Sequence, residues 1–181
     1  MKKWWLVFCM FLFVPSAFAG GELEIGQDFP GLLLPRPSEQ AMTAYLGLAD
    51  GVREFNVSQI KADLIVVEFF SMYCPHCQHE APLLNDLYDL LRKEGLDAQV
   101  KMMGIGIGNS AYEVGIFQEK FEIPFPLFAD EDYIWHAEVG QVGTPYFVFV
   151  TLDQGVGKVA FTHIGRIDSA SWFLMKVKKY L

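Results

Sequence analysis

Two cysteines three positions apart, Cys74 and Cys77, carry the most distinctive chemistry in this chain. The apolar stretch 64–70 precedes them, and leucines at helical spacing follow them, so the pair falls where a strand is followed by a helix. The free N–H groups and the dipole at a helix N-terminus favour an anion, so we expect the pKa of the Cys74 thiol to be lowered. A Cys-x-x-Cys pair at such a junction in an α/β chain indicates redox chemistry.

A static disulfide and a metal site are the two alternatives to redox chemistry at the cysteine pair. A static disulfide would add little stability, because it closes a very short loop. A metal site is suggested by the nearby His76 and His79, but these four side chains cannot all converge on one ion from a single helical turn. A remote ligand such as His163 would have to complete a Cys₂His copper-type site. We therefore assign no metal ligand and keep copper delivery as the alternative of another class.

Three further side chains are placed to tune the pair. Glu68 lies six residues before Cys74 within an apolar strand, so its carboxyl would be desolvated and could exchange protons with Cys77; the alternative is an acid on a solvated side of the sheet. Glu80 follows on the same helix and could also tune the thiols, or it could be an ordinary exposed acid. His76 could donate to the Cys74 thiolate and favour the reduced form.

The surrounding elements predict an α/β fold with a central mixed β-sheet flanked by helices. We expect strands at residues 42–48 (an edge strand), 64–70, 98–107, 146–150 and 158–164. We expect helices from the cysteine pair to Gly95, from a Ser110 cap to about Phe121, from Asp132 through Glu138, and from an Asp168 cap to the C-terminus. Three consecutive acids at residues 130–132 are expected to form a solvated turn.

The N-terminus has the pattern of an export signal. Lys2 and Lys3 precede an uncharged apolar run, and small residues at Ala17 and Ala19 predict cleavage after Ala19. The run is too short to span a bilayer, which takes roughly 20 residues; an uncleaved membrane anchor is the alternative. We thus expect a signal peptide at residues 1–19, an irregular lead-in at 20–40 and one domain at 41–181. Export, with the periplasm as the expected destination, would place the cysteines in an oxidising compartment.

Composition excludes several classes. The 181 residues are 52% hydrophobic, which is too apolar for a disordered chain. A formal charge of −8 argues against a nucleic-acid partner, which would need a basic surface. Three cysteines are too few for a disulfide scaffold.

The segment from Glu68 to Cys77 resembles the active site of the thioredoxin superfamily. Its Cys-Pro-His-Cys core is similar to that of DsbA-type thiol oxidases, although Tyr73 stands where a tryptophan is common. Downstream, Gly143-Thr144-Pro145 before an apolar strand resembles the cis-proline strand of that superfamily. Glu80 and Pro82 match a pattern that resembles the exported TlpA/ResA-like thiol–disulfide oxidoreductases. The resemblance covers roughly residues 26–181.

This resemblance implies a thioredoxin-like fold and a role for each site residue. It implies that Cys74 is the nucleophile, that Cys77 is the resolving thiol, and that Pro145 is cis and exposes the Thr144 backbone to a substrate segment. The interval between Cys77 and Pro145 leaves room for one helix–strand unit and a short insert, as in the TlpA/ResA-like group. It is too short for the separate helical domain of DsbA-type enzymes.

The expected function is exported thiol–disulfide exchange with substrate proteins, in the reductase direction by preference and in the oxidase direction as the alternative. The redox-active pair itself would serve as the redox centre, so no dissociable cofactor is expected. Partners would be proteins with thiols or disulfides and a membrane redox partner. A peroxide-reducing peroxiredoxin is disfavoured, because the chain has no Thr-x-x-Cys motif.

Overall fold

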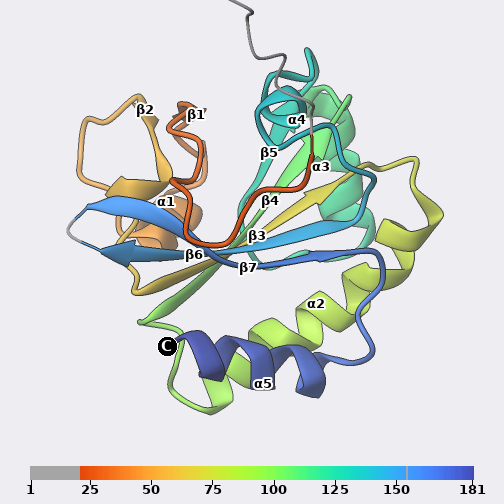
Figure 1. The fold of residues 1–181 in the computed structure, drawn as a ribbon. Coiled ribbons are helices and arrows are strands. Elements are labelled where there is room, and N and C mark those ends of the chain that lie inside the picture. Colours follow the sequence, from red (N-terminus) through yellow and green to blue (C-terminus); the bar gives the residue numbers. More distant parts are fainter. Residues whose placement is uncertain (1–20, 154) are drawn as a thin grey trace, which may run out of the picture.

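The computed structural model describes residues 21–153 and 155–181, and it shows a five-stranded sheet with helices on both faces (Figure 1). The sheet order is β5-β4-β3-β6-β7. Its strands are β3 (Leu64–Phe70), β4 (Val100–Ile107), β5 (Leu127–Asp130), β6 (Tyr146–Asp153) and β7 (Val156–Ile164). Two short strands, β1 (Leu34–Pro35) and β2 (Glu54–Phe55), form a separate antiparallel pair. The predicted signal peptide at residues 1–19 lies outside the described residues.

Strand β3 is the centre of the sheet. All seven of its residues are buried, and it pairs in parallel with β4 on one side and antiparallel with β6 on the other. A strand with neighbours on both sides and helices on both faces exposes neither face to water, which explains its nearly continuous run of apolar residues. The sheet is therefore mixed, as the sequence predicts.

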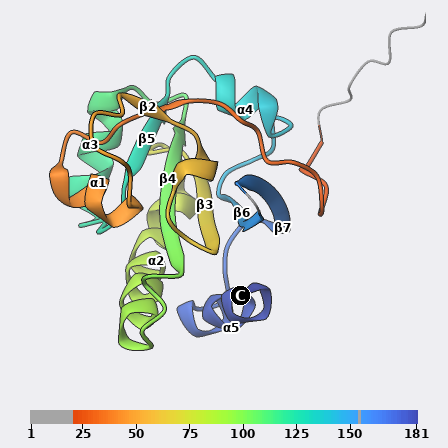
Figure 2. The same ribbon diagram turned by 90° about the vertical axis from the view of Figure 1, so that its left-hand side faces the viewer.

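The helices of the described residues are α1 (Gln40–Leu46), the 3₁₀ turn η1 (Val57–Gln59), α2 (Pro75–Lys93), α3 (Ala111–Lys120), α4 (Ile134–Glu138) and α5 (Ala170–Tyr180). Helices α2 and α5 lie side by side against one face of the sheet (Figures 1 and 2). Their apolar residues and those of α3 share one core cluster, whereas α1, α4 and the lead-in contribute to the cluster on the opposite face. None of the helices in the described part of the chain is long and apolar enough to cross a membrane.

The edge strand predicted at residues 42–48 is wrong, because this stretch lies mainly in helix α1. Thr43 and Leu46 are buried one turn apart, and Gly47 ends the helix in a left-handed conformation with φ 66°. The short apolar run fits both the helical period and the alternation of a strand, and only the burial of one helical face distinguishes the two.

The predicted solvated turn at residues 130–132 is also wrong in its first residue. Asp130 is buried, and its two carboxylate oxygens accept hydrogen bonds from the N–H groups of Trp135 and His136 at 3.0 and 2.9 Å. It ends strand β5, which the sequence patterns do not reveal, and holds the start of α4. At the last helix the cap is Ser169 rather than Asp168, since the Ser169 hydroxyl accepts from Trp172 N–H at 3.1 Å.

The register of β3 and β6 brings the two candidate loops together. Phe69 pairs with Tyr146, so the end of β3 lies beside the start of β6. The residues just after β3, including Cys74, must therefore approach Pro145, which immediately precedes β6. Between Cys77 and Pro145 the chain completes helix α2 and then forms strand β4, helix α3, strand β5 and the short helix α4.

Candidate active site

Cys74 occupies the N-cap of helix α2. Its Sγ accepts a hydrogen bond from the Cys77 N–H at 3.4 Å, and Pro75 occupies the first turn, where its missing N–H would have had no partner in the helix. The Cys74 thiol donates to the Thr144 carbonyl oxygen at 3.3 Å. Cys74 and Cys77 are both free thiols in the structure, one half-buried and the other buried. The first sulfur is thus within reach of solvent and the second is held beneath it.

Opposing influences act on the Cys74 thiol. Partial burial raises its pKa, whereas hydrogen bonds from the backbone of Cys77, the side chain of Thr144 and the backbone of His76 lower it. The net effect is a pKa lowered from the ordinary value of a cysteine. The amides at the start of α2 therefore stabilise the thiolate, as expected for a helix N-terminus.

Alkylation by iodoacetamide should report this stabilisation. Because the thiolate is the reactive form, we expect Cys74 to react faster than free cysteine at pH 7 and its rate to reach half-maximum below about pH 8.5. The measurement is the rate of alkylation against pH, with the modified residue located by mass spectrometry. Buried Cys77 is the internal control and should stay unmodified in the folded protein. A midpoint at or above that of free cysteine would contradict the geometry.

Cys77 has the opposite environment. Burial and, after it, the charge of Glu68 raise the pKa of its thiol far above the ordinary value. Its side chain belongs to the core cluster between the sheet and helices α2, α3 and α5. Cys77 therefore remains protonated at neutral pH and can act as a nucleophile only if another group takes its proton.

Glu68 is a buried acid that shares the environment of Cys77, because it projects from β3 on the same face of the sheet. Alternate residues of a strand share a face, so Glu68 faces the same side as Leu64, Val66 and Phe70, which pack in the cluster that contains Cys77. Its Oε1 is buried and, among the described residues, has no hydrogen-bond partner. Burial, the charge of Glu80 and the charge of Cys74 raise the pKa of Glu68 to about 8. The carboxyl is thus on the face of the sheet that packs against α2, poised between its two protonation states.

Glu80 is fully buried rather than exposed on its helix. Its Oε1 accepts from Arg166 Nε at 3.1 Å, and its Oε2 accepts from the Ile167 N–H at 3.2 Å. Arg166 lies between β7 and α5, 86 positions further along the chain. No pattern in the sequence indicates this arginine, because the contact depends on how α5 packs against α2.

His76 is the histidine expected to tune the thiolate, and His163 is the one required by the copper alternative. The His76 side chain is exposed, and its backbone rather than its ring hydrogen-bonds the Cys74 sulfur. His163, the remote ligand of the copper alternative, instead places Nε2 at 2.9 Å from the Arg166 carbonyl oxygen and stacks on Phe161. Within residues 21–153 and 155–181, no three His, Cys, Asp or Glu side chains are grouped to hold a metal ion.

The Thr144–Pro145 peptide bond is cis, in agreement with the expectation from the resemblance. Pro145 is buried and Thr144 is half-buried, directly across from Cys74. The Thr144 carbonyl oxygen therefore faces the Cys74 sulfur from the residue that precedes the cis-proline.

Asn109 is a site residue that sequence reasoning missed. It is fully buried after β4, and its Oδ1 accepts from the Met72 N–H at 2.8 Å, two residues before Cys74. Its Nδ2 has no hydrogen-bond partner in the described part of the chain. A buried asparagine at the end of a central strand is the signal that could have revealed it, since such an amide requires a partner.

Replacing Asn109 with alanine should destabilise the fold and loosen the cysteine loop. Loss of the acceptor leaves the Met72 N–H without a partner, which costs about 1–3 kcal/mol. Urea unfolding measures that cost, and Cys74 alkylation in the same variant measures the loop. An unchanged unfolding free energy would show that the contact is dispensable.

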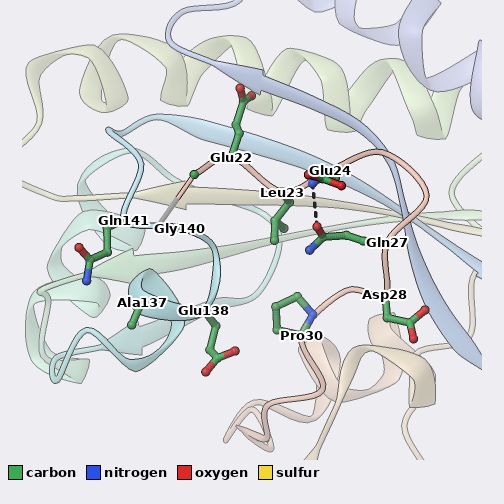
Figure 3. Close-up of a pocket in the computed structure, with 11 residues that line it drawn as sticks. Glu22, Leu23, Glu24, Gln27, Asp28, Pro30, Ala137, Glu138, Gly140 and Gln141 are labelled. Atoms are coloured by element: carbon green, nitrogen blue, oxygen red, sulfur yellow. Dashed lines mark hydrogen bonds between the residues drawn. The ribbon is translucent and has the colours of Figure 1, made fainter. Parts of the chain in front are cut away.

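A separate cavity of about 860 Å³ lies between the lead-in and the end of α4 with the segment that follows it (Figure 3). Its lining includes four acids, Glu22, Glu24, Asp28 and Glu138, and neither cysteine. The candidate chemistry is therefore at the start of α2 and not in this cavity.

A mixed sheet whose central strand leads into a helix capped by the first of two cysteines, opposite a cis-proline, defines a thioredoxin-like fold with a dithiol site. The chain belongs to the AhpC/TSA family, whose model matches residues 25–154.

The chain is similar in sequence to curated thiol-disulfide oxidoreductases and in fold to solved structures. The thiol-disulfide oxidoreductase ResA of Geobacillus kaustophilus is 27% identical over 97 residues, covering 52% of this chain and 53% of ResA. The chain thus aligns with about half the length of the curated relatives it matches first. A candidate thiol:disulfide interchange protein DsbE from Chlorobium tepidum superposes with a TM-score of 0.66 at 15% identity, covering 88% of this chain and 99% of that one. A secreted Mycobacterium tuberculosis disulfide oxidoreductase gives a TM-score of 0.58 at 21% identity, covering 70% and 89%.

Proposed function

We propose that this protein is an exported thiol–disulfide oxidoreductase that exchanges disulfides with substrate proteins through Cys74 and Cys77. The observation that carries the proposal is the Cys74 sulfur at the N-terminus of α2, 3.4 Å from the Cys77 N–H and 3.3 Å from the Thr144 carbonyl oxygen. The Cys77 N–H favours a thiolate at Cys74, the second thiol lies one helical turn away, and the Thr144 carbonyl oxygen borders the Cys74 sulfur. The names of the ResA relatives support the same chemistry.

In the reductase direction the reaction has two steps. The Cys74 thiolate attacks a substrate disulfide, which breaks that S–S bond, forms a mixed disulfide and releases one substrate thiolate, which takes up a proton from water. Cys77, after losing its proton, then attacks the Cys74 sulfur and releases the second substrate thiol. The substrate gains two electrons and the protein is left with a Cys74–Cys77 disulfide, so no dissociable cofactor is needed.

Glu68 has the catalytic role of accepting the Cys77 proton in the second step. A carboxyl with a pKa of about 8 is partly ionised at neutral pH and is a stronger base than an ordinary glutamate. The burial that makes Cys77 a poor acid also places this base on the same side of the sheet. Proton transfer between them lets a buried thiol become a nucleophile without contact with bulk water.

The reductase direction is preferred, and a DsbA-like oxidase is the alternative. A strong oxidant requires a very stable reduced form, to which an imidazole beside the thiolate would contribute. The His76 ring is exposed rather than packed against the sulfur, and burial opposes the lowering of the Cys74 pKa. Thr144 and Pro145 would bind the substrate segment, with the Thr144 backbone pairing beside its cysteine.

The partners follow from this direction. A reductase must be re-reduced after each turnover, so a membrane-bound dithiol donor on the exported side is proposed as its electron source. Export to the periplasm by a signal cleaved after Ala19 stays part of the proposal, with an N-terminal membrane anchor as the alternative.

Equilibration with glutathione tests the proposal. The fraction of Cys74–Cys77 disulfide is measured by mass spectrometry at a series of glutathione ratios. A reversible two-electron couple near about −270 mV supports the reductase, and one near about −120 mV would support the oxidase instead. Failure to form any intramolecular disulfide would overturn the function. Stoichiometric Cu(I) binding that is lost on His163→Ala would favour the copper metallochaperone.

A further inference from the structure

Arg166 connects the end of the sheet to the buried side of the cysteine helix. Its Nε donates to Glu80 at 3.1 Å, and its Nη2 lies 3.0 Å from both ring nitrogens of His79. The carbonyl oxygen of Arg166 lies 2.9 Å from His163 Nε2, which fixes the backbone of the same residue. A half-exposed arginine is therefore held at both its backbone and its side chain.

Glu80 lies on the same side of α2 as Cys77, since residues three apart share a helical face. That face is buried and packs toward the sheet, where Glu68 projects from β3. Both oxygens of Glu80 are hydrogen-bonded, one to a guanidinium and one to the Ile167 N–H. The site therefore contains one carboxylate anchored by an ion pair and a backbone N–H, and one buried carboxyl whose Oε1 has no partner among the described residues.

We propose that Arg166 is a positioning residue of the dithiol site: it holds Glu80 as a buried carboxylate and so fixes a negative charge within electrostatic reach of Glu68. The inference rests on the proposed function only in giving the Glu68 proton a catalytic use. Arg166 does not touch the sulfurs, and it acts through Glu80.

The charged groups around Glu68 and Glu80 determine how each substitution should change the ionisation of Glu68. Glu68 is under the influence of Glu80 and Cys74, and it acts in turn on Cys77. Glu80 is contacted by Arg166 and, at 3.7 Å, by His79 Nδ1. Removing the Glu80 charge makes Glu68 easier to ionise, whereas removing the Arg166 charge leaves Glu80 uncompensated and makes Glu68 harder to ionise.

The experiment is a ¹³C NMR titration of the Glu68 carboxyl in the full chain, which needs no substrate. From a wild-type midpoint near pH 8, Glu80→Gln should lower it, and Arg166→Gln should raise it, each by about one pH unit. Arg166→Lys keeps the charge and should stay near the wild-type midpoint. The double variant with Glu80→Gln and Arg166→Gln should titrate as Glu80→Gln does, because Arg166 acts only through Glu80. The double variant has no unpaired buried charge, so it can still be measured if Arg166→Gln fails to fold.

Lys178→Gln is the matched control. Lys178 of α5 pairs with Glu94, which caps the C-terminal end of α2, so this ion pair lies at the opposite end of that helix from the cysteines. This variant should leave the Glu68 midpoint unchanged. The inference is overturned if Arg166→Gln leaves the midpoint unchanged or lowers it, or if the double variant departs from Glu80→Gln.

Activity separates this inference from the proposed function. In an active protein, the pH midpoint of disulfide exchange should shift in the same directions as the NMR midpoint. A wild-type protein that exchanges no disulfide while the titrations behave as described would refute the function and leave the role of Arg166 in place. An active protein whose Glu68 midpoint does not respond to the Arg166 substitutions would refute the role of Arg166 and leave the proposed function in place.

Discussion

Cys74→Ser is expected to lower the rate of insulin-disulfide reduction by at least about 10³-fold. A serine hydroxyl cannot form the mixed disulfide, and the amides at the start of α2 cannot lower its pKa to a useful range. The measurement is the turbidity of reduced insulin with dithiothreitol as electron donor.

Cys77→Ser is the matched comparison, since it makes the same substitution one helical turn away. It should keep the first attack, because Cys74 retains its solvent access and its hydrogen bonds from Thr144 and His76. Turnover should stall at the mixed disulfide. If Cys74→Ser retained a rate within about tenfold of wild type, Cys74 would not be the nucleophile.

Glu68→Gln is expected to stabilise the folded protein at alkaline pH. The folded-state pKa is raised from 4.5 to about 8, so the contribution of Glu68 to stability is fully present below pH 4.5 and is lost as pH rises through about 8. Well above pH 8 the loss approaches roughly 5 kcal/mol. Glutamine does not ionise, so the variant should gain stability over wild type as pH rises.

Urea unfolding at about pH 5, 7 and 9 measures this difference. Glu131→Gln, the same substitution at an exposed acid, is the control, and its stability should differ from that of wild type by a similar small amount at all three pH values. The same Glu68→Gln variant should slow the release of substrate by Cys77, because the buried thiol loses its base. A stability difference that does not change between pH 5 and pH 9 would mean that Glu68 ionises like an ordinary glutamate.

Local sequence signals are sufficient to predict the centre of the fold. Seven consecutive residues from Leu64 and the helical leucines after Cys77 place the cysteine pair at a strand–helix junction, and the structure has that junction. The mixed sheet follows from the same patterns. The short helix α1 is mistaken for a strand because seven residues are too few for the two periods to differ clearly.

Contacts distant in sequence account for what could not be predicted. Glu80 looks like an exposed helical acid until α5 brings Arg166 against it from 86 positions away. Asn109 supports Met72 across 37 positions, and Asp130 is buried only because α4 folds back on its carboxylate. In each case the side chain's partner, and not its own type or spacing, determines its role.

Trapping of the covalent intermediate tests the central claim most directly. The Cys77→Ser variant is mixed with a disulfide-bonded peptide, and the adduct is mapped by mass spectrometry after proteolysis without reductant. The account predicts a stoichiometric mixed disulfide on Cys74 that the wild-type protein resolves and does not accumulate. Absence of an adduct on Cys74 in a folded variant would contradict it.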